Sequence, residues 1–497
     1  MDTVRTAQGL IRGSEDGGVL SCLGLPFAAP PVGELRWAPP AEPASWSGVR
    51  DATRFGNAAI QPAGGIPLGA GQSEDCLYLN VFTTTPDPAA RRPVMVWIHG
   101  GGFVRGAASE PGTPGGPLAR HGVVLVTVNY RLGPLGFLAH PHVSPNLAVQ
   151  DWVAALTWVR RNIADFGGDP GNVTVFGQSA GAAACRALLQ TPSAHGLFHR
   201  AIFMSAGFED FAAVETPDRA RAAGVTERFV ADLGHRDIGD LRKLPIEDVA
   251  AAASRWQGTF PPPGELHTPA NLVWCPAPDS ETVTDDFTGR PADVEVMFGV
   301  TRDEARFFHG PDGVLPPRRE RPADIYTPRT LAAMARRLGG TRAADIVAHF
   351  QERRLSPYEA LAELTTAAVW HEPALATYHR FAAPDRTAYF YEFARHSPGS
   401  VTSGLLAQHT ADIAYVFGTV AAGDFYDGTD AEVADAMRHA WTTFARTGVP
   451  TDPDGTPWPA CETTEPRFTV IEDRPRARPL STFDTPLCRL IAARRAN

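Results

Sequence analysis

The segment at residues 173–181 constrains the fold of this chain more than any other part of its sequence. Residues 173–176 form a short apolar run typical of a buried strand, and Gly177-Gln178-Ser179-Ala180-Gly181 follows it directly. A serine on a sharp turn between a strand and a helix needs an unusual backbone, and side chains at the two glycine positions would collide with neighbouring elements. The pattern predicts that the Ser179 hydroxyl stands clear of a sheet at the start of a helix.

Other short apolar runs, rich in Val, Ile and Phe, predict further strands that are buried on both faces. They lie at 93–98, 123–128, 201–204, 294–298, 387–393 and 468–471. Helical periodicity at 150–166, 180–190 and 430–446 lies between them. This alternation predicts an α/β fold, with a mostly parallel central sheet flanked by helices.

Two stretches interrupt the alternation of strands and helices. Residues 209–290 and 311–383 are rich in Ala, Arg and Pro and have helical periodicity. We interpret them as helical excursions from the sheet that form a cap. Because the 497 residues contain no linker-like change of composition, no internal repeat and no low-complexity tract, we expect a single catalytic domain over residues 1–497.

Composition and charge exclude several classes of protein. The net charge is −10 without a dense Lys/Arg run, which argues against nucleic-acid binding. No apolar stretch approaches the roughly 18 residues needed to cross a bilayer, and the first residues lack the pattern of a signal peptide. The six cysteines include no CxxC pair, so neither a disulfide scaffold nor a zinc ribbon is indicated. We expect a monomeric, cytoplasmic protein with reduced thiols and no membrane partner.

A second glycine-rich segment, His99-Gly100-Gly101-Gly102-Phe103, follows the predicted strand at 93–98. Acyl transfer builds negative charge on the former carbonyl oxygen, and backbone N–H groups fixed in advance stabilise that charge. Consecutive glycines let the backbone approach a substrate closely. The sequence therefore predicts an oxyanion hole made by the N–H groups of Gly101, Gly102 and Ala180.

A serine nucleophile needs a base within hydrogen-bond reach and a carboxylate that orients the base. In this kind of fold the acid and then the histidine follow the serine along the chain. Asp303 and Glu304 both lie in the loop after the strand at 294–298, and their spacing does not distinguish them. His396 and His409 both follow the strand at 387–393, and we favour His409 as the base.

Taken together, these motifs resemble the type-B carboxylesterase and cholinesterase-like family of α/β-hydrolases, in particular its bacterial, para-nitrobenzyl-esterase-like carboxylesterases. The segment 166–181 reproduces the serine signature of that family, and 73–81 matches its second signature. The resemblance is dense over residues 24–207 and patchy to about residue 450. It implies the α/β-hydrolase fold and the hydrolysis of carboxylic esters.

The resemblance also implies roles for individual residues. The family acid is the glutamate of a G-x-x-x-D-E-G pattern, which falls on Glu304, and the family histidine heads a run ending in Y-V-F-G, which falls on His409. Asp412 then becomes a supporting residue. The chain departs from the pattern at Thr410, where Gly is common, and at Ala305, where Gly is usual. It also lacks the upstream cysteine that many secreted members pair with the residue equivalent to Cys76, so we expect Cys76 to be unpaired.

We therefore hypothesise a serine carboxylesterase that acts through an acyl-enzyme, with Ser179, Glu304 and His409 as its triad. No metal or organic cofactor is needed. The substrate is expected to be a small hydrophobic ester in an apolar pocket. Candidate pocket residues are Phe103, Phe208, Phe307, Phe308 and Phe417.

Three other functions fit parts of the sequence. A carbamate or amide hydrolase would use the same triad and differ in the leaving group and the pocket. A catalytically inactive, cholinesterase-like binding protein would usually lack a triad member, and none is missing here. A lipase would need an exposed apolar lid, and no amphipathic helix of that kind is evident.

Overall fold

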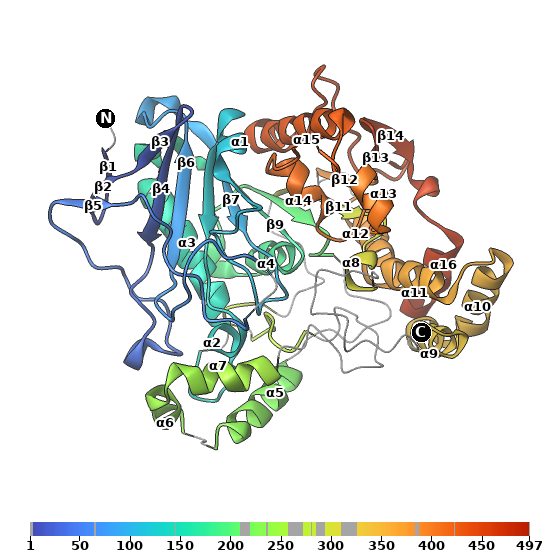
Figure 1. Cartoon of the computed structure of the whole chain (residues 1–497), viewed down its shortest axis with the longest axis horizontal. Helices are drawn as coiled ribbons and strands as arrows, with labels where there is room; N and C mark the ends of the chain where they lie inside the picture. The colour runs from blue at the N-terminus through green and yellow to red at the C-terminus, as the bar shows by residue number, and fades with distance from the viewer. Residues whose placement is uncertain are drawn as a thin grey trace.

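The structure is a computed structural model (Figure 1) and describes residues 3–63, 66–144, 146–208, 219–234, 237–256, 272–279, 281–284, 294–309, 326–382, 387–421 and 423–496. Within these residues, eleven strands form one large sheet. Their order across the sheet is β14 (Pro475–Pro479), β13 (Arg467–Ile471), β12 (Ala388–Phe393), β11 (Glu295–Thr301), β10 (Arg200–Met204), β9 (Gly168–Gln178), β7 (Arg92–Ile98), β8 (Val124–Val128), β6 (Tyr78–Thr83), β4 (Val19–Pro26) and β3 (Ser14–Asp16). A small sheet at the N-terminal end holds β1 (Thr3–Thr6), β2 (Gly9–Arg12) and β5 (Val49–Asp51).

The centre of the large sheet is parallel, from β8 through β7 and β9 to β13. These seven strands coincide with the apolar runs in the sequence, so the predicted parallel α/β fold is confirmed. The flanking strands β14, β6, β4 and β3 are antiparallel to their neighbours. The sequence did not predict them, because polar residues such as Asn80 in β6 interrupt their apolar pattern.

Helices cover both faces of the sheet, and alternate residues of each strand supply the two cores. In β7, Val96 packs in the core under α3 (Leu147–Asn162) and α4 (Ala180–Leu189), whereas Trp97 packs in the core under α15 (Gly428–Thr447). Both side chains are 1% exposed. Burial on both faces is the reason why the central strands are continuously apolar.

Both predicted excursions contain helices, but residues 272–279 and 281–284 of the first form none. The first contains α5 (Arg219–Asp232), α6 (Ile238–Lys243) and α7 (Ile246–Arg255), which lie near α2 (Gly133–Phe137) in Figure 1. The second contains α9 (Pro328–Gly339), α10 (Ala343–Glu352), α11 (Pro357–Thr366) and α12 (Glu372–Phe381). The remaining parts of the excursions, including 257–271 and 310–325, lie outside the described residues, and the cap stays a prediction.

Two further features bear on the predicted class of protein. Within the described ranges, no helix has both the length and the apolarity to cross a membrane. All six cysteines are free, and Cys76 is buried and unpaired, as expected from the sequence.

Candidate active site

Ser179 occupies the sharp turn between β9 and α4. Its backbone has φ 57° and ψ −126°, a conformation that residues other than glycine rarely adopt. The flanking glycines are required by close backbone contacts, because a Cβ at Gly177 would lie 2.4 Å from the Gly181 carbonyl carbon, and a Cβ at Gly181 would lie 2.0 Å from the Ile98 oxygen. The Ser179 amide donates to the Met204 oxygen at 2.8 Å, which ties the turn to β10.

The glycine-rich loop after β7 lies directly against this turn. A Cβ at Gly100 would lie 2.7 Å from the Gln178 oxygen and 3.3 Å from the Ser179 Cβ. Gly101 and Gly102 have φ of 103° and 63°, which favour glycine. Ala180 is the first residue of α4, and a first-turn N–H has no partner within its helix. The structure thus brings the three predicted oxyanion donors to the loop and turn around Ser179.

Glu304 and His409 form a buried pair. His409 Nδ1 lies 2.5 Å from Glu304 Oε2, and the two residues are 2% and 0% exposed. The Thr301 amide donates to the other carboxylate oxygen at 2.8 Å, and the His409 amide donates to the Glu304 carbonyl at 3.2 Å. Because a carboxylate accepts the Nδ1–H, the neutral imidazole carries its lone pair on Nε2.

The lone pair on Nε2 points to the turn that carries Ser179. The side-chain amide nitrogen of Gln178, the residue before Ser179, lies 3.2 Å from His409 Nε2. Since Nε2 can only accept, the Gln178 amide donates to it. The residues that the structure describes include no hydrogen-bond partner for the Ser179 hydroxyl.

A second acid–histidine pair stands next to the first. His396 Nε2 lies 2.9 Å from Asp303 Oδ2, and these side chains are 34% and 19% exposed. The two candidate acids and two candidate histidines are therefore sorted into two pairs. Only the pair of Glu304 and His409 is fully buried and in contact with the residue beside Ser179.

Three aromatic side chains surround the His409 ring. Phe307 and Phe308, both half-buried, have ring centroids 5.8 and 5.3 Å from the imidazole. Trp370 lies 5.4 Å away and donates its indole N–H to the Ser205 oxygen at 3.0 Å. Trp370 comes from a π-helical turn, Ala367–His371, a feature frequent at functional sites. The sequence did not reveal it, because it ends an ordinary apolar helical run.

The other phenylalanines proposed for the pocket lie in the core. Phe103 is 1% exposed and packs on Phe137 at 5.2 Å. Phe417 is fully buried against Trp97 at 4.8 Å, in the core under α15. Phe208 is also buried. Phenylalanine is among the residue types most often fully buried, and these three rings pack in the core.

Two buried ionisable groups shape the electrostatics of the site. His99 stacks on Tyr130 with ring centroids 4.4 Å apart, and burial lowers its pKa to about 4, so it is neutral. Asp412 is fully buried and accepts from the Tyr391 hydroxyl at 3.1 Å. Burial and the nearby charge of Glu304 raise the pKa of Asp412 to about 7.

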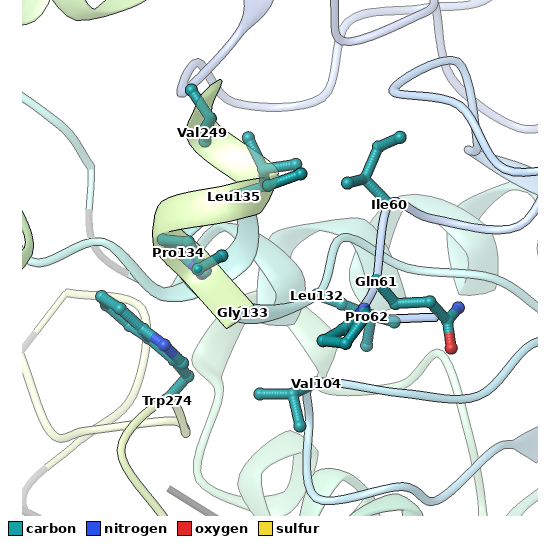
Figure 2. A pocket seen from close by; sticks show the side chains of 12 residues that line it. Ile60, Gln61, Pro62, Val104, Leu132, Gly133, Pro134, Leu135, Val249 and Trp274 are labelled. Atoms are coloured by element: carbon teal, nitrogen blue, oxygen red, sulfur yellow. The ribbon is translucent and has the colours of Figure 1, made fainter. Parts of the chain in front are cut away.

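A small, mainly apolar pocket lies next to the glycine-rich loop (Figure 2). Val104 follows the loop directly, and Gln61 is fixed at the rim by two hydrogen bonds with the backbone of Gly106, both 2.9 Å long. The remaining lining comes from the segment after β8, from α7 and from nearby loops. It consists of Ile60, Pro62, Leu132, Gly133, Pro134, Leu135, Val249, Ala250, Ala253 and Trp274.

Comparison with known proteins gives a consistent result. A family model described as carboxylesterase family matches residues 1–485. The chain is 36% identical over 498 residues to the para-nitrobenzyl esterase of Bacillus subtilis, and the aligned region covers 95% of this chain and 94% of the relative. It is 34% identical over 495 residues to the phenmedipham hydrolase of Pseudarthrobacter oxydans, covering 94% of each. A solved PNB esterase structure superposes with a TM-score of 0.82 at 31% identity and covers 99% of each chain.

Proposed function

The chain belongs to the carboxylesterase family and is a carboxylic ester hydrolase, and we propose that it acts through Ser179, His409 and Glu304. Ser179 attacks the ester carbonyl while His409 Nε2 takes the hydroxyl proton. The N–H groups of Gly101, Gly102 and Ala180 stabilise the negative charge on the carbonyl oxygen. His409 then gives the proton to the departing alcohol, which leaves an acyl group on Ser179.

The second half of the reaction uses the same groups. Water gives a proton to His409 Nε2 and attacks the acyl carbonyl. When the tetrahedral intermediate collapses, the proton returns to the Ser179 oxygen and the carboxylic acid leaves. The Glu304 carboxylate stabilises the imidazolium that forms in each half of the reaction.

One observation carries this assignment. The buried 2.5 Å contact between Glu304 and His409 fixes the imidazole tautomer, and the contact of Nε2 with the side chain of Gln178, the residue before Ser179, supports His409 as its base. Asp303 and His396 lack this position, because their pair is partly exposed and neither contacts Gln178. The glycine-rich loop against Ser179 supports the oxyanion assignment.

A small hydrophobic ester is the substrate class that the surroundings favour. Phe307, Phe308 and Trp370 present rings around the base, and the apolar pocket near Val104 adjoins the oxyanion loop. Apolar walls with few polar groups suit uncharged acyl and alcohol groups. A panel of aryl and alkyl esters of graded chain length, with matched carbamates and anilides, tests this. Faster turnover of a carbamate or anilide than of every ester would contradict it.

The nucleophile is tested with an organophosphate and mass spectrometry. We expect one label per chain on Ser179 and complete loss of labelling and of ester hydrolysis in Ser179→Ala. Ser14→Ala, in an exposed strand, is the matched control and should keep both. Labelling retained in Ser179→Ala would refute the assignment.

The base is tested by comparing two alanine variants. His409→Ala should lower kcat by about 10⁴-fold, since the oxyanion hole alone gives only a modest acceleration. His396→Ala should lower kcat far less. The reverse order of the two losses would make His396 the base.

We also propose that the protein is a cytoplasmic monomer. Six free cysteines support a reducing compartment. Titration of the denatured protein without reductant should find six thiols, and size exclusion should give the mass of one chain. A disulfide or a dimer would contradict one part of this proposal.

A further inference from the structure

Resting on the proposed triad, we propose that Asp303 and His396 form a positioning pair that holds the loop carrying His409 in a strained conformation. The loop at residues 404–410 connects α13 (Pro398–Ser403) to α14 (Ala411–Val416). It carries the base but makes no part of the sheet. Its geometry must therefore be held by contacts with other elements.

Strain in this loop is visible in its backbone. Leu406 and Thr410, on either side of His409, have φ of 54° and 77°, in the left-handed region that residues with a Cβ rarely adopt. Such residues persist only where the surrounding contacts fix them. Without those contacts, the loop would relax toward ordinary dihedral angles and move the imidazole.

The Leu406 amide donates to the Ser400 oxygen of α13 at 3.1 Å. The other contacts that fix the loop come from the segment that also carries Glu304. Asp303 Oδ2 accepts from the Ala407 amide at 3.2 Å, and the Asp303 amide donates to the Ala407 oxygen at 2.9 Å. Arg306 donates to the Gly404 oxygen at 2.9 Å. Two residues beyond Ala407, the His409 amide donates to the Glu304 carbonyl at 3.2 Å. The segment 303–306 therefore hydrogen-bonds the loop that carries His409 at Gly404, Ala407 and His409.

His396 fixes the direction of the Asp303 carboxylate. Its Nε2 lies 2.9 Å from the same oxygen, Oδ2, that accepts from Ala407. The Arg306 guanidinium lies 3.7 Å from the other oxygen. With both oxygens engaged, the carboxylate cannot turn away from Ala407. Within the described residues, no hydrogen bond, ion pair or ring contact joins the side chain of Asp303 or His396 to Ser179 or His409, so the pair acts through the loop.

The test compares variants at Asp303 by kinetics with a para-nitrophenyl ester. Asp303→Ala removes the acceptor and should lower kcat by about 10- to 100-fold with little change in KM, because misplacing a reacting group by about 1 Å costs up to 10²-fold. Asp303→Asn keeps an oxygen for Ala407 and His396 and should stay within about 3-fold of the parent. Arg302→Gln is the matched control, because Arg302 pairs with Glu392 and Glu472, away from the loop.

A spectroscopic signature separates positioning from a general loss of stability. The short Nδ1–H···O bond between His409 and Glu304 should give a far-downfield proton resonance in the parent, in Asp303→Asn and in Arg302→Gln. Asp303→Ala should broaden or lose it. If Asp303→Ala does not fold, His396→Phe, which keeps a ring but cannot donate, should lower kcat by about 5- to 10-fold with the same loss of signal.

Each outcome decides the proposal. A folded Asp303→Ala enzyme with kcat within 2-fold of the parent and an intact resonance overturns it. A loss of kcat in Arg302→Gln equal to the loss in Asp303→Ala also overturns it. If Asp303→Asn fails as completely as Glu304→Gln, Asp303 is the triad acid and the proposed function itself is wrong. Failure of the positioning pair alone leaves organophosphate labelling of Ser179 unchanged.

Discussion

Residues with a side chain and a positive φ lie at or beside the proposed reacting groups. Ser179 has φ of 57°, and Leu406 and Thr410 flank His409 at φ of 54° and 77°. A left-handed residue with a Cβ costs about 1–2 kcal/mol relative to ordinary helical dihedrals. Local stability is given up where the orientation of a hydroxyl and an imidazole must be fixed.

Thr410 gives a direct measure of this strain. Thr410→Gly should raise the free energy of unfolding by about 0.5–1 kcal/mol, because relief of the Cβ strain outweighs the extra entropy of the unfolded glycine. Thr402→Gly, at an exposed position of the helix α13, should lower the free energy of unfolding instead. Urea unfolding of both variants checks the prediction, and equal signs would contradict it.

Asp412 should make stability depend on pH. The pKa of its carboxyl is 3.8 when unperturbed and about 7 in the folded protein, where burial and then Glu304 raise it. Between these values the folded state binds more protons, so Asp412 lowers the stability as pH rises from about 4 to 7. Asp412→Asn lacks this loss. The difference in free energy of unfolding between Asp412→Asn and the parent should therefore grow, in favour of the variant, by at least about 1 kcal/mol from pH 5 to pH 8.

Urea unfolding at pH 5 and pH 8 measures this difference. Glu42→Gln, at a surface carboxyl that is 69% exposed, is the control and should show no such gain. A gap between Asp412→Asn and the parent that does not change with pH would mean that Asp412 is ionised throughout.

At the scale of elements, β7, β9 and α4 approach one another too closely for side chains at their contacts. Gly177 and Gly181 face each other across the turn, and Gly181 also meets the end of β7 at the Ile98 oxygen. The loop after β7 reaches the same place through Gly100. The close approach of three elements places the oxyanion loop beside Ser179.

Gly181→Ala tests this packing. Its Cβ would lie 2.0 Å from the Ile98 oxygen, so α4 or β7 must shift. We expect a loss of roughly 2–4 kcal/mol of stability, in the range of overpacked sites, and a large loss of activity. Gly428→Ala, at the first residue of α15 with open space around it, should leave both nearly unchanged. Thermal unfolding measures the stability of both variants, and ester hydrolysis measures their activity.

At the scale of the whole molecule, buried arginines join segments that are distant in sequence. Arg36 pairs with both Glu74 oxygens at 2.6 Å and donates to the Leu244 oxygen at 2.7 Å and the Arg242 oxygen at 3.2 Å. It thereby ties the N-terminal loops to the segment between α6 and α7. The helix α7 in turn lines the pocket beside the glycine-rich loop.

Arg36→Lys should loosen this connection without removing the charge beside Glu74. Lysine cannot replace the forked donor set, so the α6–α7 carbonyls lose their partners. We expect amide hydrogen exchange to rise about 10-fold over residues 238–255 and to stay unchanged in β7 and β9. Arg12→Ala, at an exposed pair with Asp51, is the control. Unchanged exchange at 238–255 would contradict the proposed tie.

The parallel strands, the turn at Ser179 and the glycine-rich loop could all be predicted from the sequence, because each is encoded in consecutive residues. A doubly buried strand must be apolar along its length, and a backbone with no room for a Cβ must be glycine. The antiparallel strands such as β6 were missed, since one polar residue, Asn80, finds its partners only in the folded sheet.

The sequence by itself thus determined the parallel centre of the sheet, the position of Ser179 and the loop that faces it. The family resemblance already implied Glu304 and His409 as acid and base. Only the tertiary structure decided that Asp303 pairs with His396, that Trp370 borders the imidazole, and that Phe417 lies in the core. Neighbouring acids, or histidines in one loop, look alike along the chain. Their roles differ because the packing of remote segments sets which are buried and what they touch.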